Sequence, residues 1–213
     1  MEPSTAIGKL RGRAARAAAH AGLVAIGLAC AAVVAAGASF PSARVGLELG
    51  TALPVAPYDF AAGWDAATGY GAFVSLGLSP DGELLVRVER DRFPLEPSRL
   101  LVSELGARQA LGGRATLEAL TFEARVRHAY GRVRAHAGIC LGLVRRSGRR
   151  VTVSYPGYTI PYGEPDASVG ARGFGVGATL DLPRLPDLTV EGRVLWFGGN
   201  EMVAPLRVGL VLP

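Results

Sequence analysis

The chain has 213 residues, a formal net charge of +5, 19% charged residues and 29 glycines. This length suits one domain, or a targeting segment followed by one domain. Residues 1–38 hold four basic residues and one acidic residue, so the remaining chain keeps a net charge of +2. The basic character therefore belongs largely to the N-terminal segment, and it does not indicate binding to nucleic acid.

The first 38 residues have the layout of a secretory signal peptide. Basic residues between positions 9 and 16 precede an uncharged, alanine-rich stretch at 21–38, which ends in a small-x-small cleavage site before Ser39. A retained helix is the alternative, because about 18 apolar residues are enough to span a bilayer. Cleavage would leave a mature domain at 39–213 with Cys140 as its one cysteine, which excludes an intrachain disulfide there.

After this segment, apolar residues alternate with polar residues or glycine, and a period of two predicts β-strands. The hairpin at residues 70–90 shows the pattern on both arms, and the strand at 133–143 carries six successive alternations. The segment at 98–111 predicts either a short helix capped by Ser98 or an extended strand, and the pattern leaves both open. The eight predicted strands lie at about 45–54, 70–78, 83–90, 116–128, 133–143, 173–182, 189–196 and 206–212.

The connections between these strands alternate in length. Short connections are predicted at 79–82, 130–132 and 183–187, long ones at 56–68, 93–113 and 145–167, and a brief last one at 198–200. Short turns at one end and long loops at the other are typical of outer-membrane barrels. We therefore predict an all-β fold: an eight-stranded antiparallel up-and-down transmembrane β-barrel, preceded by a helical signal peptide.

The polar faces of the predicted strands carry glycine and charges of both signs. An eight-stranded barrel has an interior that side chains can just fill, and a buried charge needs a partner of opposite sign. We therefore predict an apolar face toward lipid and a lumen filled by paired ions. The predicted network comprises Glu48, Arg87, Glu89, Glu123, Arg125, Arg127, Arg134, His136, Glu191, Arg193 and Arg207. A soluble β-sandwich or periplasmic barrel is the alternative, since alternation alone does not show which face of the strands meets water.

The strand count, the connection lengths and the opening Val45-Gly46-Leu47-Glu48-Leu49-Gly50 resemble the small eight-stranded outer-membrane barrels of the OmpA and OmpX type, over residues 43–213. The resemblance implies a location in the bacterial outer membrane after export, contact with its lipid, and assembly by its assembly machinery. Aromatic residues near the predicted strand ends are expected to form an interfacial girdle. They are Tyr58, Tyr70, Phe93, Tyr130, Trp196 and Phe197.

Enzymatic activity is not predicted. His128 and His136 lie near the turn at Tyr130, and a pair of His136 with Glu123 can be drawn, but hydrogen-bonded filling of the lumen is the better explanation of these residues. Neither a Gly-x-Ser-x-Gly elbow nor an HExxH motif occurs. Cys140 suits a small filler between glycines, and no metal ligand set or cofactor is expected.

An arginine cluster in the loop predicted at 145–167 is the one surface feature that suggests a ligand. Arg145, Arg146, Arg149 and Arg150 are placed to contact lipopolysaccharide phosphates through bidentate hydrogen bonds. A solvated loop whose charge aids solubility is the alternative. Nucleic acid is not expected as a partner, because this loop would lie outside the cell.

These observations lead us to expect a monomeric barrel with a structural or surface-contact role exerted through its outer loops. A narrow pore for small solutes and a soluble periplasmic binding module are the two alternatives.

Overall fold

The computed structural model describes residues 43–57, 61, 63–95, 109–155, 158–163 and 165–212. The predicted signal peptide and mature-domain boundary lie outside these ranges and stay predictions. Residues 98–108, which belong to the segment predicted as either a helix or a strand, also lie outside these ranges. Within the described ranges, no helix has the length and hydropathy needed to cross a membrane.

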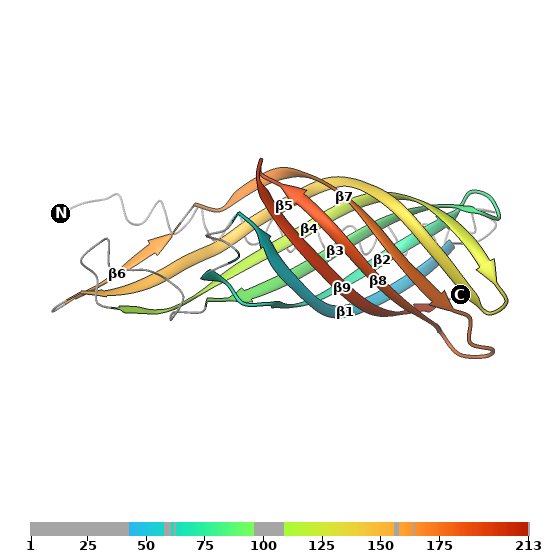
Figure 1. The fold of residues 1–213 in the computed structure, drawn as a ribbon, viewed down its shortest axis with the longest axis horizontal. Coiled ribbons are helices and arrows are strands. Elements are labelled where there is room, and N and C mark those ends of the chain that lie inside the picture. Colours follow the sequence, from blue (N-terminus) through green and yellow to red (C-terminus); the bar gives the residue numbers. More distant parts are fainter. Residues whose placement is uncertain are drawn as a thin grey trace. The chain divides into compact units, whose positions relative to one another are not determined.

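Antiparallel strands make up almost all of the described chain. They are β1 (Ala43–Ala56), β2 (Ala67–Gly77), β3 (Gly82–Pro94), β4 (Gln109–Tyr130), β5 (Val133–Tyr155), β6 (Tyr158–Gly163), β7 (Ala167–Leu180), β8 (Asp187–Phe197) and β9 (Glu201–Leu212). Eight of them form a cylinder, while β6 pairs only with the far part of β5 (Figure 1). Each strand of the cylinder pairs with the next along the chain, which confirms the predicted up-and-down order.

The cylinder closes where the first strand meets the last. β1 and β9 pair antiparallel from Val45 opposite Leu212 to Leu53 opposite Ala204, and one irregularity follows Pro54. β4 and β5 also pair, so the described cylinder has no open edge. Closure satisfies the backbone amide and carbonyl groups of every strand, which a hydrocarbon environment requires.

The connections divide the barrel into two ends, here called the turn end and the loop end. The turn end has connections at 78–81, 131–132 and 181–186, whereas the loop end has those at 57–66, 95–108, 156–166 (which contains β6) and 198–200. The tightest turn contains Gly131, whose φ of 61° favours glycine. The predicted alternation of short and long connections is confirmed.

The strand that holds the arginine cluster is longer than predicted. A loop was expected from Arg145, but β5 continues to Tyr155 and pairs with β6, with Val153 opposite Ile160. β4 likewise begins at Gln109 instead of Thr116. Both strands leave the apolar band, so alternation is no longer needed there, while backbone pairing still holds the residues in extended form.

The side chains alternate between the two faces of the wall as predicted. On the outer face, Leu49 is 69% exposed and Ile139 is 70% exposed, whereas Arg87 and Arg207 point inward and are almost fully buried. Exposed large apolar residues are normally scattered singly on a soluble protein. Here they cover the outside of the cylinder, and the charges are enclosed.

Candidate functional site

The centre of the lumen is an ion-pair network organised around Arg87. This side chain is fully buried, and its two terminal nitrogens donate hydrogen bonds of 2.8 Å to the carboxylate oxygens of Glu191. Its Nε lies 3.4 Å from Glu48 Oε1, and its Nη1 lies 3.7 Å from Glu123 Oε2. Arg87 on β3 therefore links carboxylates that β1, β4 and β8 present from around the wall.

A second group of ions extends this network toward the loop end. Arg193 donates a short hydrogen bond to Glu89, and its Nε lies 3.3 Å from Glu191 Oε1. Arg207 Nη2 donates to Asp91 Oδ1 at 2.5 Å, and its Nε donates to Glu89 at 3.2 Å. Asp91 was not among the predicted network residues, because the predicted third strand ended one residue before it.

A third group extends the network toward the turn end. Arg125 donates to Glu123 at 2.6 Å and to Glu191 at 2.5 Å. His136 Nε2 lies 3.5 Å from Glu191 Oε2. Glu191 is thus shared by Arg87, Arg125, Arg193 and His136, and it is the acid through which the three groups connect.

The structure places all of the predicted network residues on the inner face. Arg127 and Arg134 are partly buried near the turn end. The buried members are Glu48, Arg87, Glu89, Glu123, Arg125, His136, Glu191, Arg193 and Arg207. Buried ions of both signs, in mutual contact, offset the desolvation that each would suffer alone.

Glycines make room for these side chains. A Cβ at Gly138 would lie 2.8 Å from Arg125 Cγ and from Glu123 Oε1, and a Cβ at Gly71 would lie 2.8 Å from Glu48 Oε1. Both distances are well below van der Waals contact. The glycines of the inner face are therefore part of the network's packing, which explains their alternation with apolar residues in β2 and β5.

An apolar layer fills the lumen between the network and the loop end, and sequence reasoning missed it. Trp64 pairs through a backbone bridge with Leu95 and closes this layer from the loop side. The buried members are Ala52, Trp64, Ala67, Phe93, Leu95, Ala115, Leu117, Cys140, Val144, Ala171, Leu195, Phe197 and Val203. A sequence signal exists: at this end of the strands, apolar residues also occupy the inward positions.

The apolar layer corrects the predicted aromatic girdle. Phe93 is fully buried and Phe197 is 2% exposed, so neither can face lipid. Tyr70 and Tyr130 are 54% and 66% exposed on the outer face, as a girdle requires. Trp196 is partly exposed and packs against Phe174, with a centroid distance of 5.7 Å.

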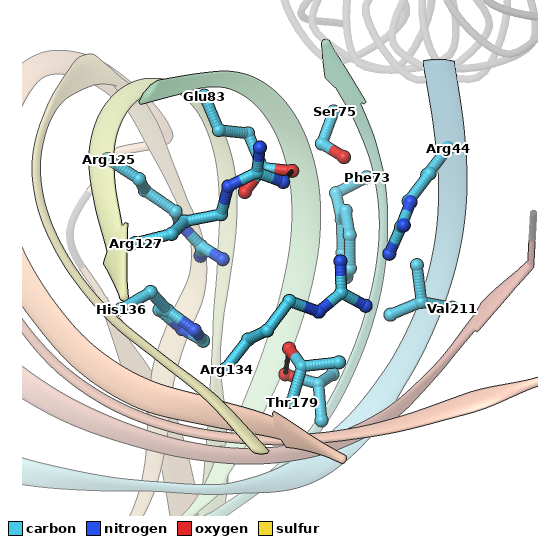
Figure 2. A pocket seen from close by; sticks show the side chains of 11 residues that line it. Arg44, Phe73, Ser75, Glu83, Arg125, Arg127, Arg134, His136, Thr179 and Val211 are labelled. Atoms are coloured by element: carbon cyan, nitrogen blue, oxygen red, sulfur yellow. Dashed lines mark hydrogen bonds and ion pairs between the residues drawn. The ribbon is translucent and has the colours of Figure 1, made fainter. Parts of the chain in front are cut away.

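A blind pocket opens from the lumen at the turn end (Figure 2). Arg44 and Arg134 both contact Asp187 Oδ2, at 3.1 and 2.7 Å, and Arg127 Nη1 lies 3.5 Å from Glu83 Oε1. The arginines that line the pocket thus have acidic partners already. Arg125 and the central network close its inner end.

The structure does not form the pair of His136 with Glu123 that the sequence allowed. His136 contacts Glu191 and not Glu123, while His128 lies on the outer face and stacks edge-on against Tyr130 at 4.7 Å. The two histidines are therefore on opposite sides of the wall. Among the described residues, no group of three or more histidine, cysteine or acidic side chains is placed to hold a metal ion.

The predicted arginine cluster is divided by the wall. Arg145 faces outward, whereas Arg146 faces the lumen and donates a 2.8 Å hydrogen bond to Glu201. The prediction of a common surface for these two residues was wrong, because consecutive residues of a strand point to opposite faces. The side chains of Arg149 and Arg150 lie outside the described part of the structure.

Fold and lumen together define a small eight-stranded β-barrel with a filled interior. Neisserial surface protein A (NspA) has this fold: its crystal structure shows 15% identity and a TM-score of 0.51, covering 80% of this chain and 96% of that one. The N-terminal β-barrel domain of Pseudomonas aeruginosa OprF gives 14% identity and a TM-score of 0.40, covering 79% and 97%. The attachment invasion locus protein Ail of Yersinia pestis gives 11% and 0.44, covering 80% and 97%.

These likenesses concern the fold. The resemblance stated from the sequence is confirmed at that level by NspA. No protein-family model matches the chain. No curated protein matches it either.

Proposed function

We propose that this protein is a monomeric outer-membrane barrel that anchors its loop end at the cell surface and conducts no solute. In this proposal residues 1–38 direct export through the inner membrane, and the outer-membrane assembly machinery inserts the barrel. The observation that carries it is the distribution of side chains on the wall, which is the reverse of that in a soluble protein: apolar side chains cover the outside, and paired ions fill the inside.

The dimensions of the wall support a location in the membrane. A strand needs about 9–11 residues to cross a bilayer, and each strand of the cylinder has at least 11. Tyr130 near the turn end and Tyr70 and Trp196 nearer the loop end suit the two interfaces. In a soluble periplasmic barrel, this exposed apolar surface would face water.

Two features of the lumen argue against a pore. Arg87 and its carboxylate partners lie across the middle of the cylinder, and the apolar layer lies between them and the loop end. A hydrated ion would have to break buried ion pairs and then cross a layer lined mainly by apolar side chains. Both steps are unfavourable.

The loop end offers the surface for contact with other molecules. There β5 extends beyond the cylinder and pairs on one side with the first residues of β4 and on the other with β6 (Figure 1). This three-stranded extension has no counterpart among the short connections of the turn end. We infer that the role of the protein is exerted here.

Fractionation and conductance measurements test the proposal. We expect the expressed chain to stay with outer membranes through a carbonate wash, and to migrate faster on a detergent gel when unheated. Refolded protein in a planar bilayer should show no discrete conductance steps. Release by carbonate would overturn the membrane location, and regular single-channel steps would overturn the closed lumen.

A further inference from the structure

Five arginines whose side chains the structure describes lie on the outer face of the barrel wall near the loop end, outside the lumen network. We call this group the arginine face: Arg90 and Arg92 on β3, Arg114 on β4, Arg145 on β5 and Arg172 on β7. Each shares its strand face with exposed apolar residues such as Leu84, Phe122, Leu143 and Phe174. The four strands are consecutive neighbours in the sheet, so the arginines occupy one sector of the wall.

The acidic residues near this sector do not balance its charge. Glu118 lies between Arg90 and Arg145, with N–O distances of 3.6 and 3.8 Å, and Asp166 lies 3.6 Å from Arg145 Nη2. Within the described ranges, two acids thus face five arginines. The three distances exceed those of ordinary hydrogen bonds, so guanidinium N–H groups remain to be satisfied.

The other three arginines have no acidic partner at all within the described chain. Arg92, Arg114 and Arg172 are exposed, and no carboxylate described by the structure lies within ion-pair distance of them. This differs from the lumen, where every arginine of the central network contacts a carboxylate. The arginine face is therefore a positively charged surface with free donors.

The five arginines also share a position along the wall, near the loop end. At the turn end, outward positions hold Leu78, Val126 and Leu212, and at the loop end the remaining strands present Leu53 and Trp196 instead. An arginine facing lipid costs about 2–4 kcal/mol at the midplane but only about 0–1 kcal/mol near an interface. Arg172 pairs in register with Trp196, a residue type that favours the interface.

We propose that the arginine face binds the phosphate groups of lipopolysaccharide in the leaflet around the loop end. A guanidinium group pairs with phosphate through two parallel hydrogen bonds, and arginines on four adjacent strands suit a lipid that carries more than one phosphate. The inference rests on the proposed outer-membrane location, which places the loop end in the outer leaflet.

Binding to refolded full-length protein in neutral detergent micelles tests this inference. Trp196, the register partner of Arg172, provides a fluorescence signal. The test variant is Arg92→Gln/Arg172→Gln, which breaks no ion pair described by the structure. The matched control is Arg132→Gln/Arg184→Gln, which removes two exposed arginines from the turn end.

We expect the test variant to bind lipopolysaccharide at least about tenfold more weakly, since each lost bond to a charged group is worth roughly that factor. The control variant should bind like the parent, and dephosphorylated lipopolysaccharide should bind the parent as weakly as the test variant binds the intact lipid. Equal binding by parent and test variant would overturn the inference. So would equal affinity for micelles containing phosphatidylglycerol, which would indicate an unspecific anionic surface.

Heat-modifiable migration of the same samples separates the two proposals. Both variants should keep this migration, because their substituted side chains lie outside the lumen. A folded, membrane-inserted barrel that ignores the lipid phosphates overturns only the inference on the arginine face. A chain that stays in the aqueous fraction overturns the proposed function and this inference together.

Discussion

Arg87 shows at the scale of one residue how the lumen tolerates charge. Its side chain has no exposed surface, and carboxylates of Glu48, Glu123 and Glu191 lie within 3.7 Å of it. Removal of one partner from a buried ion pair leaves the other charge uncompensated. That loss is far larger than the net worth of the pair, because desolvation of the remaining ion is no longer offset.

Arg87→Met should therefore lower the free energy of unfolding by about 3–5 kcal/mol. Methionine keeps much of the side-chain length, so the change reports mainly on the lost charge. Urea unfolding of the refolded protein in lipid vesicles measures the effect. Arg132→Met is the control: this residue lies exposed in a turn, and its substitution should change stability by less than about 0.5 kcal/mol. Equal stabilities of the two variants would mean that the network contributes nothing to folding.

Glycine at the inner face is a packing requirement that a single methyl group can test. In Gly138→Ala the new Cβ would lie 2.8 Å from Arg125 Cγ and Ala124 O, so we expect a loss of about 1–3 kcal/mol from overpacking. Gly192→Ala is the matched control, since nothing lies within 4 Å of its Cβ position. The same urea titration should leave Gly192→Ala unchanged or slightly more stable. A Gly138→Ala barrel as stable as the parent would contradict the close packing seen here.

At the scale of elements, β5 carries the contrast between the two faces of the wall. Ile139 faces outward and is 70% exposed, while its neighbour Cys140 faces inward and is 3% exposed. Exposure to solvent and exposure to lipid make opposite demands on Ile139. Only in lipid is a charge at this position unfavourable.

Ile139→Arg should destabilise the inserted barrel by about 2–4 kcal/mol, the value for arginine near the bilayer midplane. Leu53→Arg, on the outer face of β1 near the loop end, should cost about 0–1 kcal/mol. Reversible unfolding in vesicles compares the two variants with the parent. If Ile139→Arg is neutral or stabilising, the outer face meets water and the soluble alternative is correct.

The elements also show what sequence reasoning can and cannot reach. The alternation at 133–143 predicts the apolar band of β5, because an apolar outer face and an ion-filled lumen impose opposite residue types. Beyond Leu143 that constraint ends, and the run of arginines and Gly148 gives no period, so the continuation to Tyr155 was missed. Backbone pairing with β4 and β6, which extends this part of β5, leaves no mark on side-chain polarity.

Inside the lumen, prediction from the sequence has a different limit. The odd or even position of a residue along a strand assigns its side chain to one face, which is enough to place Glu191 and Arg193 in the lumen. It does not show which ions are in contact. The pairing of Arg207 with Asp91 depends on strand stagger around the cylinder. Phe197 belongs to the same inward set as Arg193 and Leu195, yet its place near a strand end suggested a girdle. For an aromatic residue at a strand end, the face to which its side chain points must be determined before the residue is assigned to an interface.

At the scale of the whole molecule, closure links all of these features. The ions in the lumen come from strands far apart in the chain, and pairing of β1 with β9 closes the wall around them. Arg207 on β9 reaches Glu89 on β3, so the network spans the seam as well. The filled lumen and the closed wall therefore depend on each other.

A disulfide across the seam tests closure directly. Leu49 and Val208 are register partners on β1 and β9, and both are exposed on the outer face. Directly opposed residues of antiparallel strands have Cα atoms about 4.5–5.5 Å apart, within the range that a disulfide spans. In a Cys30→Ala/Cys140→Ala background, Leu49→Cys/Val208→Cys should form this bond on mild oxidation.

The bond turns residues 49–208 into a covalent ring, so the heated, unreduced protein should migrate differently from the reduced protein. Leu49→Cys/Val176→Cys is the control, because Val176 on β7 lies three strands from β1, or about 14 Å along the wall. It should show no ring. An open sheet would separate β1 from β9 and leave both variants unlinked, and a wall without closure could not keep the lumen ions away from solvent.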